Sequence, residues 1–179
     1  MLKPEHTVLV LVDIQEKLSN AMHEKAVLLE NAVKIVRGAK ILDVPIVWTE
    51  QNPKGLGQTV PEVKELLAGS EAVTKMSFSC CGEPAFMDEI HKLGRKQVVV
   101  GGIESHVCVY QTVADLVKLG YEVQVLADCV SSRTPGNRAV GIERCKEAGA
   151  SMTSVETVLF ELLGAAEGDR FKAMLKVGK

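Results

Sequence analysis

Thr7-Val8-Leu9-Val10-Leu11-Val12 is an unbroken apolar run near the start of the chain, and it ends at Asp13. A second run, Gln97-Val98-Val99-Val100-Gly101-Gly102, also shows no alternation of polar and apolar residues. Continuous apolar runs of this length are typical of strands buried on both faces of a parallel sheet. Segments with helical periodicity separate the strand-like runs, so the pattern predicts an α/β fold.

Six strands are expected, at 7–12, 44–49, a brief segment that ends at Lys75, 97–102, 121–127 and 150–153. Helices are expected over 18–39, 59–67, 84–94, 105–120 and 137–148, with closing helices through Leu175. Thr59 and Ser105 are the expected N-caps of their helices. Segments 50–58 and 128–136 are rich in turn residues and are expected to be loops.

The chain has 179 residues, of which 46% are hydrophobic, so a single domain spanning 1–179 is expected. The net charge is −2 and no Lys/Arg run is present, which makes nucleic acid an unexpected partner. No apolar run reaches the roughly 18 residues of a membrane span, and no signal-peptide pattern is seen. We therefore expect a cytoplasmic protein that does not bind membranes.

The five cysteines are an odd number, which fits reduced thiols better than a disulfide framework. They are Cys80, Cys81, Cys108, Cys129 and Cys145. We interpret the adjacent pair as loop thiols and the last two as packing residues. No C-x-x-C pair or zinc-like histidine spacing occurs, and the paired glycines at 101–102 are too short for a dinucleotide fingerprint. No metal and no cofactor are expected.

Three reactive side chains follow different strands: Asp13, Lys75 and Cys108. In a doubly wound sheet, the carboxyl ends of the strands form the ligand crevice at the point where the strand order reverses. A helix N-terminus and a nearby ammonium would lower the pKa of the Cys108 thiol, while Asp13 could accept its proton. Backbone N–H groups of the same first turn could stabilise an oxyanion, so an amidase-like reaction is feasible.

Four segments, in this order and spacing, resemble the isochorismatase-like cysteine hydrolase family across nearly the whole chain. They are Val12-Asp13-Ile14-Gln15, Lys75 with Phe78-Ser79, Gly102-Ile103-Glu104-Ser105-His106-Val107-Cys108-Val109 and Ala127-Asp128-Cys129-Val130-Ser131-Ser132-Arg133. The resemblance implies a Rossmann-like three-layer sandwich with a six-stranded parallel sheet. It also implies an Asp13, Lys75 and Cys108 triad, a cis peptide between Ile103 and Glu104, and an oxyanion hole made by the amides of Glu104 and Cys108.

Two departures narrow the substrate class. Nicotinamidases of the family hold a metal with an Asp and two His after the second strand, whereas 50–58 contains neither residue type. True isochorismatases lack the nucleophilic cysteine, which is present here. We expect a cysteine hydrolase of a small-molecule amide or related C–N bond, acting through a thioester-type intermediate. Gln15, Phe78 and Ile103 are the expected substrate-pocket residues, although Gln15 could equally occupy a turn.

Each residue also has a simpler interpretation when taken alone. A cysteine near a helix start is usually a small buried hydrophobe, Asp13 could be a turn former, and Lys75 a surface charge. His106 is expected at the surface or in a lid. Two other functions stay open: a redox sensor in which Cys108 pairs with Cys80 or Cys81, and a non-catalytic binding protein. The resemblance and the amphipathic C-terminal helices favour a homo-oligomer.

Overall fold

Six parallel strands form one sheet in this computed structural model, which describes residues 1–177. Their spatial order is β3-β2-β1-β4-β5-β6, so the predicted α/β class and six-stranded parallel sheet are confirmed. The strands are β1 (Thr7–Val12), β2 (Ile46–Gln51), β3 (Val73–Lys75), β4 (Gln97–Ile103), β5 (Glu122–Ser131) and β6 (Ser151–Thr153). The order reverses between β1 and β4, which lie side by side as expected.

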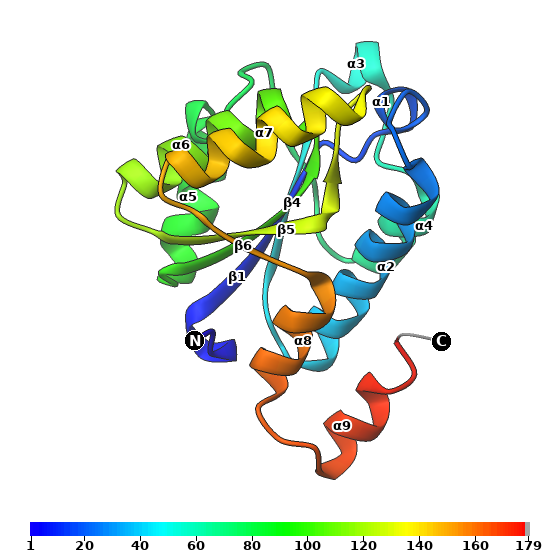
Figure 1. Cartoon of the computed structure of the whole chain (residues 1–179), viewed down its shortest axis with the longest axis vertical. Coiled ribbons are helices and arrows are strands. Elements are labelled where there is room, and N and C mark those ends of the chain that lie inside the picture. The colour runs from blue at the N-terminus through cyan, green and yellow to red at the C-terminus, as the bar shows by residue number, and fades with distance from the viewer. Residues whose placement is uncertain (178–179) are drawn as a thin grey trace.

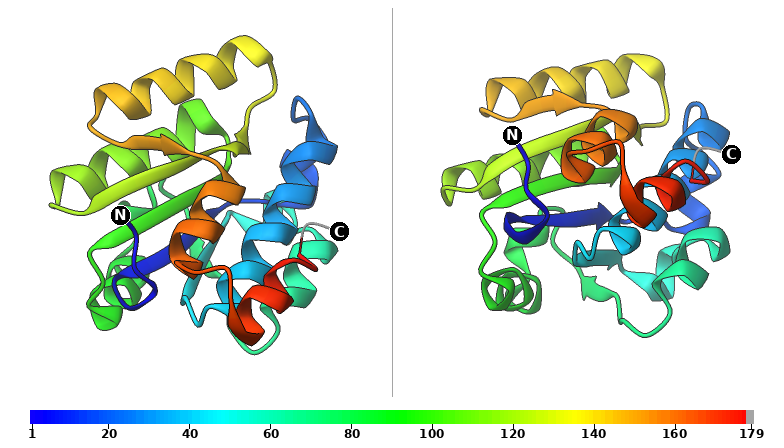
Figure 2. Two further views of the ribbon diagram at one scale, coloured as in Figure 1. Left: turned by 60° about the horizontal axis from the view of Figure 1, so that its bottom comes forward. Right: turned by 90° about the horizontal axis from the view of Figure 1, so that it is seen from below.

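Helices cover both faces of this sheet (Figure 1). One face carries α2 (Lys25–Ile41), α4 (Pro61–Lys64), α8 (Val155–Leu163) and α9 (Gly168–Met174). The other carries α5 (Pro84–Leu93), α6 (Tyr110–Lys118) and α7 (Pro135–Glu147). Figure 2 shows α9 beside α2, which it contacts. Within the described residues, no helix has both the length and the apolar character that crossing a membrane requires.

The remaining elements are short. They are α1 (Glu16–Ser19) and α3 (Pro53–Leu56), the 3-10 turns η1 (Pro4–His6), η2 (Glu65–Leu67) and η3 (Cys80–Gly82), and the π-helical turn η4 (Ser105–Val109). Alternate residues of β1 point to opposite faces, so Leu9 and Leu11 pack under α2 and α8, while Val8 and Val10 pack under α5 and α6. Both faces of the central strand are therefore buried, as its continuous apolar run predicted.

Two expected loops contain regular structure. Residues 50–58 include the end of β2 and the helix α3, which begins at Pro53. The strand β5 runs on to Ser131 instead of ending at residue 127, because the β4–β5 register shifts between Val100 and Gly102 and pairing then resumes at Val130. An irregularity of this kind has no turn signature in the sequence, so the loop interpretation of 128–131 was wrong.

Both expected N-caps were also wrong. The residue that caps η4 is Glu104, because the Ser105 hydroxyl bonds the Ser132 hydroxyl at 2.7 Å instead of a helix amide. The N-cap of α4 is Val60, and the Thr59 hydroxyl has no partner within the described residues. By contrast, Gly94 ends α5 in the left-handed conformation as predicted, with φ of 62°.

Gly102 fixes how closely β4 approaches β1. Its φ is +125°, and a Cβ there would lie 2.1 Å from the Val12 carbonyl oxygen. Only glycine can adopt this conformation at this distance from a neighbouring backbone. The residues that follow Gly102 are thereby brought close to the residue that follows Val12.

Candidate active site

The side chains of Asp13 and Lys75 meet in the interior of the protein. Asp13 follows β1, with a left-handed φ of 52°, and Lys75 ends β3 at the edge of the sheet. The Lys75 side chain spans the end of β2, so that its Nζ lies 2.7 Å from Asp13 Oδ2. Both side chains are 0% exposed. A surface interpretation of Lys75 is therefore wrong, because the lysine forms a buried ion pair.

Three further oxygens surround the Lys75 ammonium. It donates to Gln51 Oε1 at 2.9 Å, to the Ser77 carbonyl at 3.1 Å and to the Phe78 carbonyl at 3.0 Å. The second carboxylate oxygen of Asp13, Oδ1, accepts a hydrogen bond from Thr49 Oγ1 at 2.7 Å. A buried ion pair is stable only when such bonds replace the lost hydration of both groups. The network therefore fixes both charges in position.

Cys108 lies beside this ion pair. Its Sγ is 3.8 Å from Gln51 Oε1, and the residue is 7% exposed. Burial raises the pKa of the Cys108 thiol to about 12, and the Asp13 carboxylate adds to the rise while the Lys75 ammonium opposes it. The expected lowered pKa was wrong, because loss of hydration outweighs the ammonium. At neutral pH the thiol is protonated, with a carboxylate next to it that can accept the proton.

Sequence reasoning missed Thr49, Gln51 and Cys80. Thr49 and Gln51 are alternate residues at the carboxyl end of β2, so the same end-of-strand rule that selected Asp13 could have found them. Cys80 was interpreted as a loop thiol, but it lies in η3, is completely buried and has its Sγ 3.7 Å from Thr49 Oγ1. Burial raises the pKa of the Cys80 thiol to about 11, and the Asp13 carboxylate contributes. No local pattern distinguishes this buried thiol from its neighbour Cys81.

The three expected pocket residues occupy different surroundings. Gln15 is buried, and its amide bonds both the N–H and the carbonyl of Gln51, at 2.8 and 3.0 Å. Phe78 is 56% exposed, and Ile103 is buried against Met22 and Leu28. Gln15 thus holds in place the residue that bonds Lys75. A role in substrate binding stays a prediction for all three.

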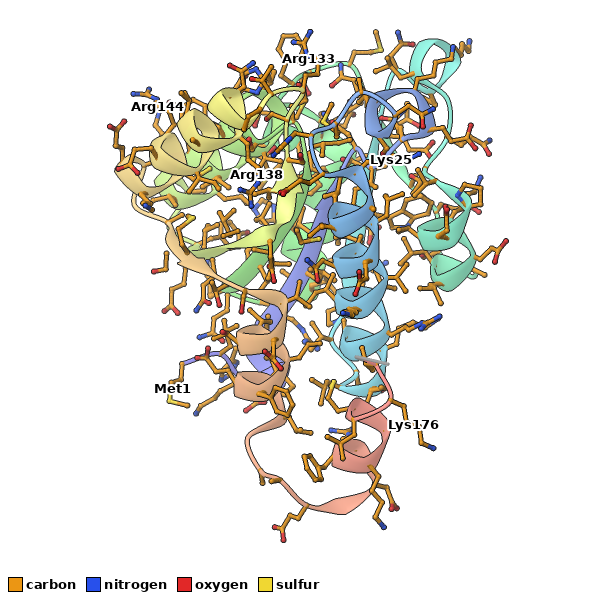
Figure 3. All side chains as sticks on the ribbon, turned by 45° about the vertical axis from the view of Figure 1, so that its right-hand side comes forward. Met1, Lys25, Arg133, Arg138, Arg144 and Lys176 are labelled. Atoms are coloured by element: carbon orange, nitrogen blue, oxygen red, sulfur yellow. The ribbon has the colours of Figure 1, made fainter. Side chains whose placement is uncertain are left out.

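The turn η4 carries Cys108 out of β4. The Ile103–Glu104 peptide is cis, as the resemblance implied, and the Glu104 carbonyl accepts from the amides of Val107 and Val109 at 3.1 and 3.2 Å. The Glu104 carboxylate is paired with Arg133 Nε at 3.1 Å, and Arg133 lies at the carboxyl edge of the sheet in Figure 3. His106 is half-buried, and its Nδ1 lies 2.9 Å from Ser132 Oγ. It is therefore less exposed than the expected surface position.

Helix α7 holds this turn at close range. A Cβ on Gly141 would lie 2.4 Å from the Ser105 carbonyl carbon and 2.5 Å from the His106 nitrogen, both of which are backbone atoms. In Figure 3, Arg138 extends from α7 towards β5, where its Nε donates to the Val130 carbonyl at 3.0 Å. The Arg138 side chain therefore ties α7 to β5, next to the turn that α7 contacts.

We expect Gly141→Ala to lower the free energy of unfolding by about 1–3 kcal/mol, the usual range for overpacking. Thermal denaturation measures the change. Gly136→Ala in the same helix is the matched control, because its added Cβ would meet only Thr134 Oγ1 at 4.0 Å. Equal stability of the two variants would show that α7 does not press on η4.

Comparison with known proteins identifies the family, since the model of the Isochorismatase domain matches residues 7–157. The chain belongs to the isochorismatase-like hydrolase family. Isochorismatase domain-containing protein 2 of Xenopus laevis is 37% identical over 96% of this chain and 82% of its own length. A secreted isochorismatase effector, Isc1 of Phytophthora sojae, is 36% identical over 98% of this chain and 86% of its own.

Solved structures of isochorismatase-like proteins share this fold. MAR1 ribonuclease from Caenorhabditis elegans superimposes with a TM-score of 0.92 at 36% identity, over 98% of this chain and 91% of that one. The octameric hydrolase YcaC of Escherichia coli gives a TM-score of 0.93 at 22% identity, over 98% and 88%. The similarity to YcaC, at 22% identity, shows a shared fold and nothing about activity.

Across residues 1–177, no group of three or more His, Cys, Asp or Glu side chains is arranged to hold a metal ion. Gln51, the last residue of β2, is followed by Asn52 and α3, and its amide oxygen accepts from the Lys75 ammonium.

Proposed function

We propose that the protein hydrolyses a small-molecule amide or related C–N bond, with Cys108 as nucleophile, Asp13 as general base and acid, and Lys75 as a fixed positive charge. The observation that carries the proposal is the buried Asp13–Lys75 ion pair next to the Cys108 thiol. A buried ion pair with a soft nucleophile beside it contributes little to stability, because hydrophobic residues would pack at least as well. Perturbed groups of this kind concentrate at functional sites.

The reaction begins with proton transfer. Asp13 takes the thiol proton as the Cys108 sulfur attacks the carbonyl carbon, and a tetrahedral oxyanion forms. The backbone N–H groups of Glu104 and Cys108 are the proposed donors to that oxyanion. Asp13 then gives its proton to the leaving nitrogen, the C–N bond breaks, and an acyl thioester remains on Cys108.

Hydrolysis of the thioester reverses these roles. Asp13 takes a proton from water, the resulting hydroxide attacks the thioester, and the C–S bond breaks. The carboxylic acid leaves and the proton returns to Cys108, which restores the resting state. Lys75 keeps the Asp13 carboxyl group oriented while that group accepts and returns the proton, because the Lys75 ammonium stays bound to Gln51 and to two backbone carbonyls.

A direct test is ammonia release from a panel of small amides and ureides. We expect turnover of at least one small neutral compound, because a thiol only 7% exposed admits small groups. Single-stranded RNA belongs in the panel, since one similar structure is described as a ribonuclease. The net charge of −2 favours the small molecule. RNA cleavage without release of ammonia from any amide would overturn the proposal.

Alkylation of Cys108 should depend steeply on pH. Because its thiol pKa is raised to about 12, the thiolate fraction grows roughly tenfold for each pH unit between 7 and 10. Peptide mass spectrometry after brief iodoacetamide treatment measures the rate for this cysteine alone. A rate that levels off near pH 7 would indicate a preformed thiolate and would contradict proton transfer to Asp13 as the activating step.

The redox-sensor alternative is less favoured. Oxidation by peroxide follows thiolate character, and burial raises the thiol pKa values of Cys80 to about 11 and of Cys81 and Cys108 to about 12. All five cysteines are free thiols. A disulfide that joins Cys108 to Cys80 or Cys81 after mild peroxide treatment would restore this alternative.

We also propose that residues 1–179 act as one hydrolase domain in a homo-oligomer without a cofactor. YcaC, which shares the fold, is described as octameric, and this supports self-association by analogy. The five free thiols favour a reducing compartment such as the cytoplasm, although one relative is described as secreted. Light scattering tests the oligomeric state, and cell fractionation tests the compartment.

A further inference from the structure

A groove of about 670 Å³ lies on the side of β2 and β3 that faces away from the triad. Successive residues of a strand point to opposite faces, so Thr49 and Gln51 face the triad, whereas Trp48 and Glu50 line the groove. The charged residues that line it are four carboxylates and one ammonium: Glu16, Glu50, Glu65, Glu71 and Lys64. The groove is therefore acidic and separate from the proposed active site.

Glu50 is the unusual member of this group. It is only 7% exposed, and its Oε1 accepts a hydrogen bond from the Thr59 N–H at 2.7 Å. Within the described chain, Glu50 makes no ion pair. The Thr59 hydroxyl, which belongs to a residue 4% exposed at the same groove, also has no partner there. A buried carboxylate without a positive partner is unfavourable, and a cation bound in the groove would supply one.

The arrangement of the carboxylates suits an extended cation better than a metal ion. Among residues 1–177 they form no group of three that could hold a metal. Glu50 is paired in the sheet with Thr74, and Glu71 lies three residues before Thr74, ahead of the start of β3, so the two carboxylates come from different segments of the groove wall. Apolar residues Trp48 and Leu67 also line the groove.

We propose that this groove binds a linear polyamine. One ammonium would pair with Glu50 and donate a further hydrogen bond to the Thr59 hydroxyl oxygen, and a second would pair with Glu71. The methylene chain would lie along Trp48 and Leu67, because alkyl segments between charged ends bury favourably on apolar surface.

Calorimetric titration of the intact protein with spermidine at low salt tests the proposal, with 1,8-octanediol and Mg²⁺ as neutral and inorganic controls. Glu50→Gln retains an acceptor for the Thr59 N–H but removes the charge, and we expect it to weaken spermidine binding at least tenfold. Glu71→Gln, at an exposed position, should weaken binding severalfold and serves if the first variant does not fold. Glu62→Gln is the matched control, because Glu62 lies on α4 outside the groove, and it should change affinity less than twofold.

Three results would overturn the proposal. One is no spermidine binding at millimolar concentration. A second is equal affinity of the wild type and both groove variants. The third is binding of octanediol or Mg²⁺ with the affinity of spermidine. Ammonia release by the same variants is a separate measurement, so loss of polyamine binding and loss of hydrolysis can be distinguished.

Discussion

Replacing Cys108 with alanine is expected to abolish turnover of every amide that the wild type hydrolyses, by a factor on the order of 10⁴ or more. The size follows from the role proposed for the sulfur, because losing the nucleophile of a covalent mechanism removes the catalytic unit as a whole. Binding should change far less, since the remaining site is intact. The measurement is kcat and KM for the best substrate of the panel, with unfolding curves to show that the variant is folded.

Cys81→Ala is the matched control for this prediction. Its thiol is half-buried and lies near the Thr112 carbonyl, and the groups that raise its pKa besides burial are Cys80 and Asp115. We expect this variant to keep kcat within about twofold of wild type. Activity in Cys108→Ala comparable to that of Cys81→Ala would remove the sulfur from the mechanism.

Breaking the buried ion pair should have the second largest effect. Removing one partner of such a pair leaves an uncompensated charge and costs about 3–5 kcal/mol. We expect this loss for Lys75→Met, which leaves the Asp13 carboxylate buried without its partner. We expect it also for Asp13→Asn, which leaves the Lys75 ammonium buried without its partner. Denaturant unfolding measures both. Turnover should be undetectable in each, because the proton acceptor is either absent or misplaced.

The double variant Asp13→Asn/Lys75→Met separates stability from catalysis. Removing both charges together should destabilise the protein by less than the sum of the single variants, since no unpaired charge remains buried. Activity should nevertheless stay absent. Additive losses of stability would show that the two side chains do not interact across their 2.7 Å contact, and recovery of turnover would exclude Asp13 as the proton acceptor.

Asp13 and Thr49 show how far the sequence predicted the site. The run before Asp13 indicated a buried strand, and the rule for strand ends then placed its carboxylate in the crevice. Thr49 and Gln51 obey the same rule on β2, but their neutral side chains carry no chemical signal, so their hydrogen bonds to the ion pair were not foreseen. Composition and strand order predict at which edge of the sheet the reactive side chains gather, but they do not predict which neutral residues bond to those side chains.

Cys108 shows where sequence reasoning failed. Its position beside a helix start and a lysine predicted a lowered thiol pKa, yet the pKa is raised to about 12 because the surrounding packing removes water. Burial depends on side chains from several distant segments, and a linear pattern does not contain it. The same limitation explains the extension of β5 to Ser131, which follows from the register of its neighbour β4 and not from its own residues.

The central claim is that the Cys108 sulfur carries an acyl group during turnover. Intact-protein and peptide mass spectrometry of a reaction quenched with acid within milliseconds tests it directly, with the best amide substrate in excess. The expected result is a mass increase on the peptide that contains Cys108, equal to the acyl group of the substrate less one hydrogen. An unmodified Cys108 at every time point during rapid turnover, with the acyl group on another residue, would contradict the account.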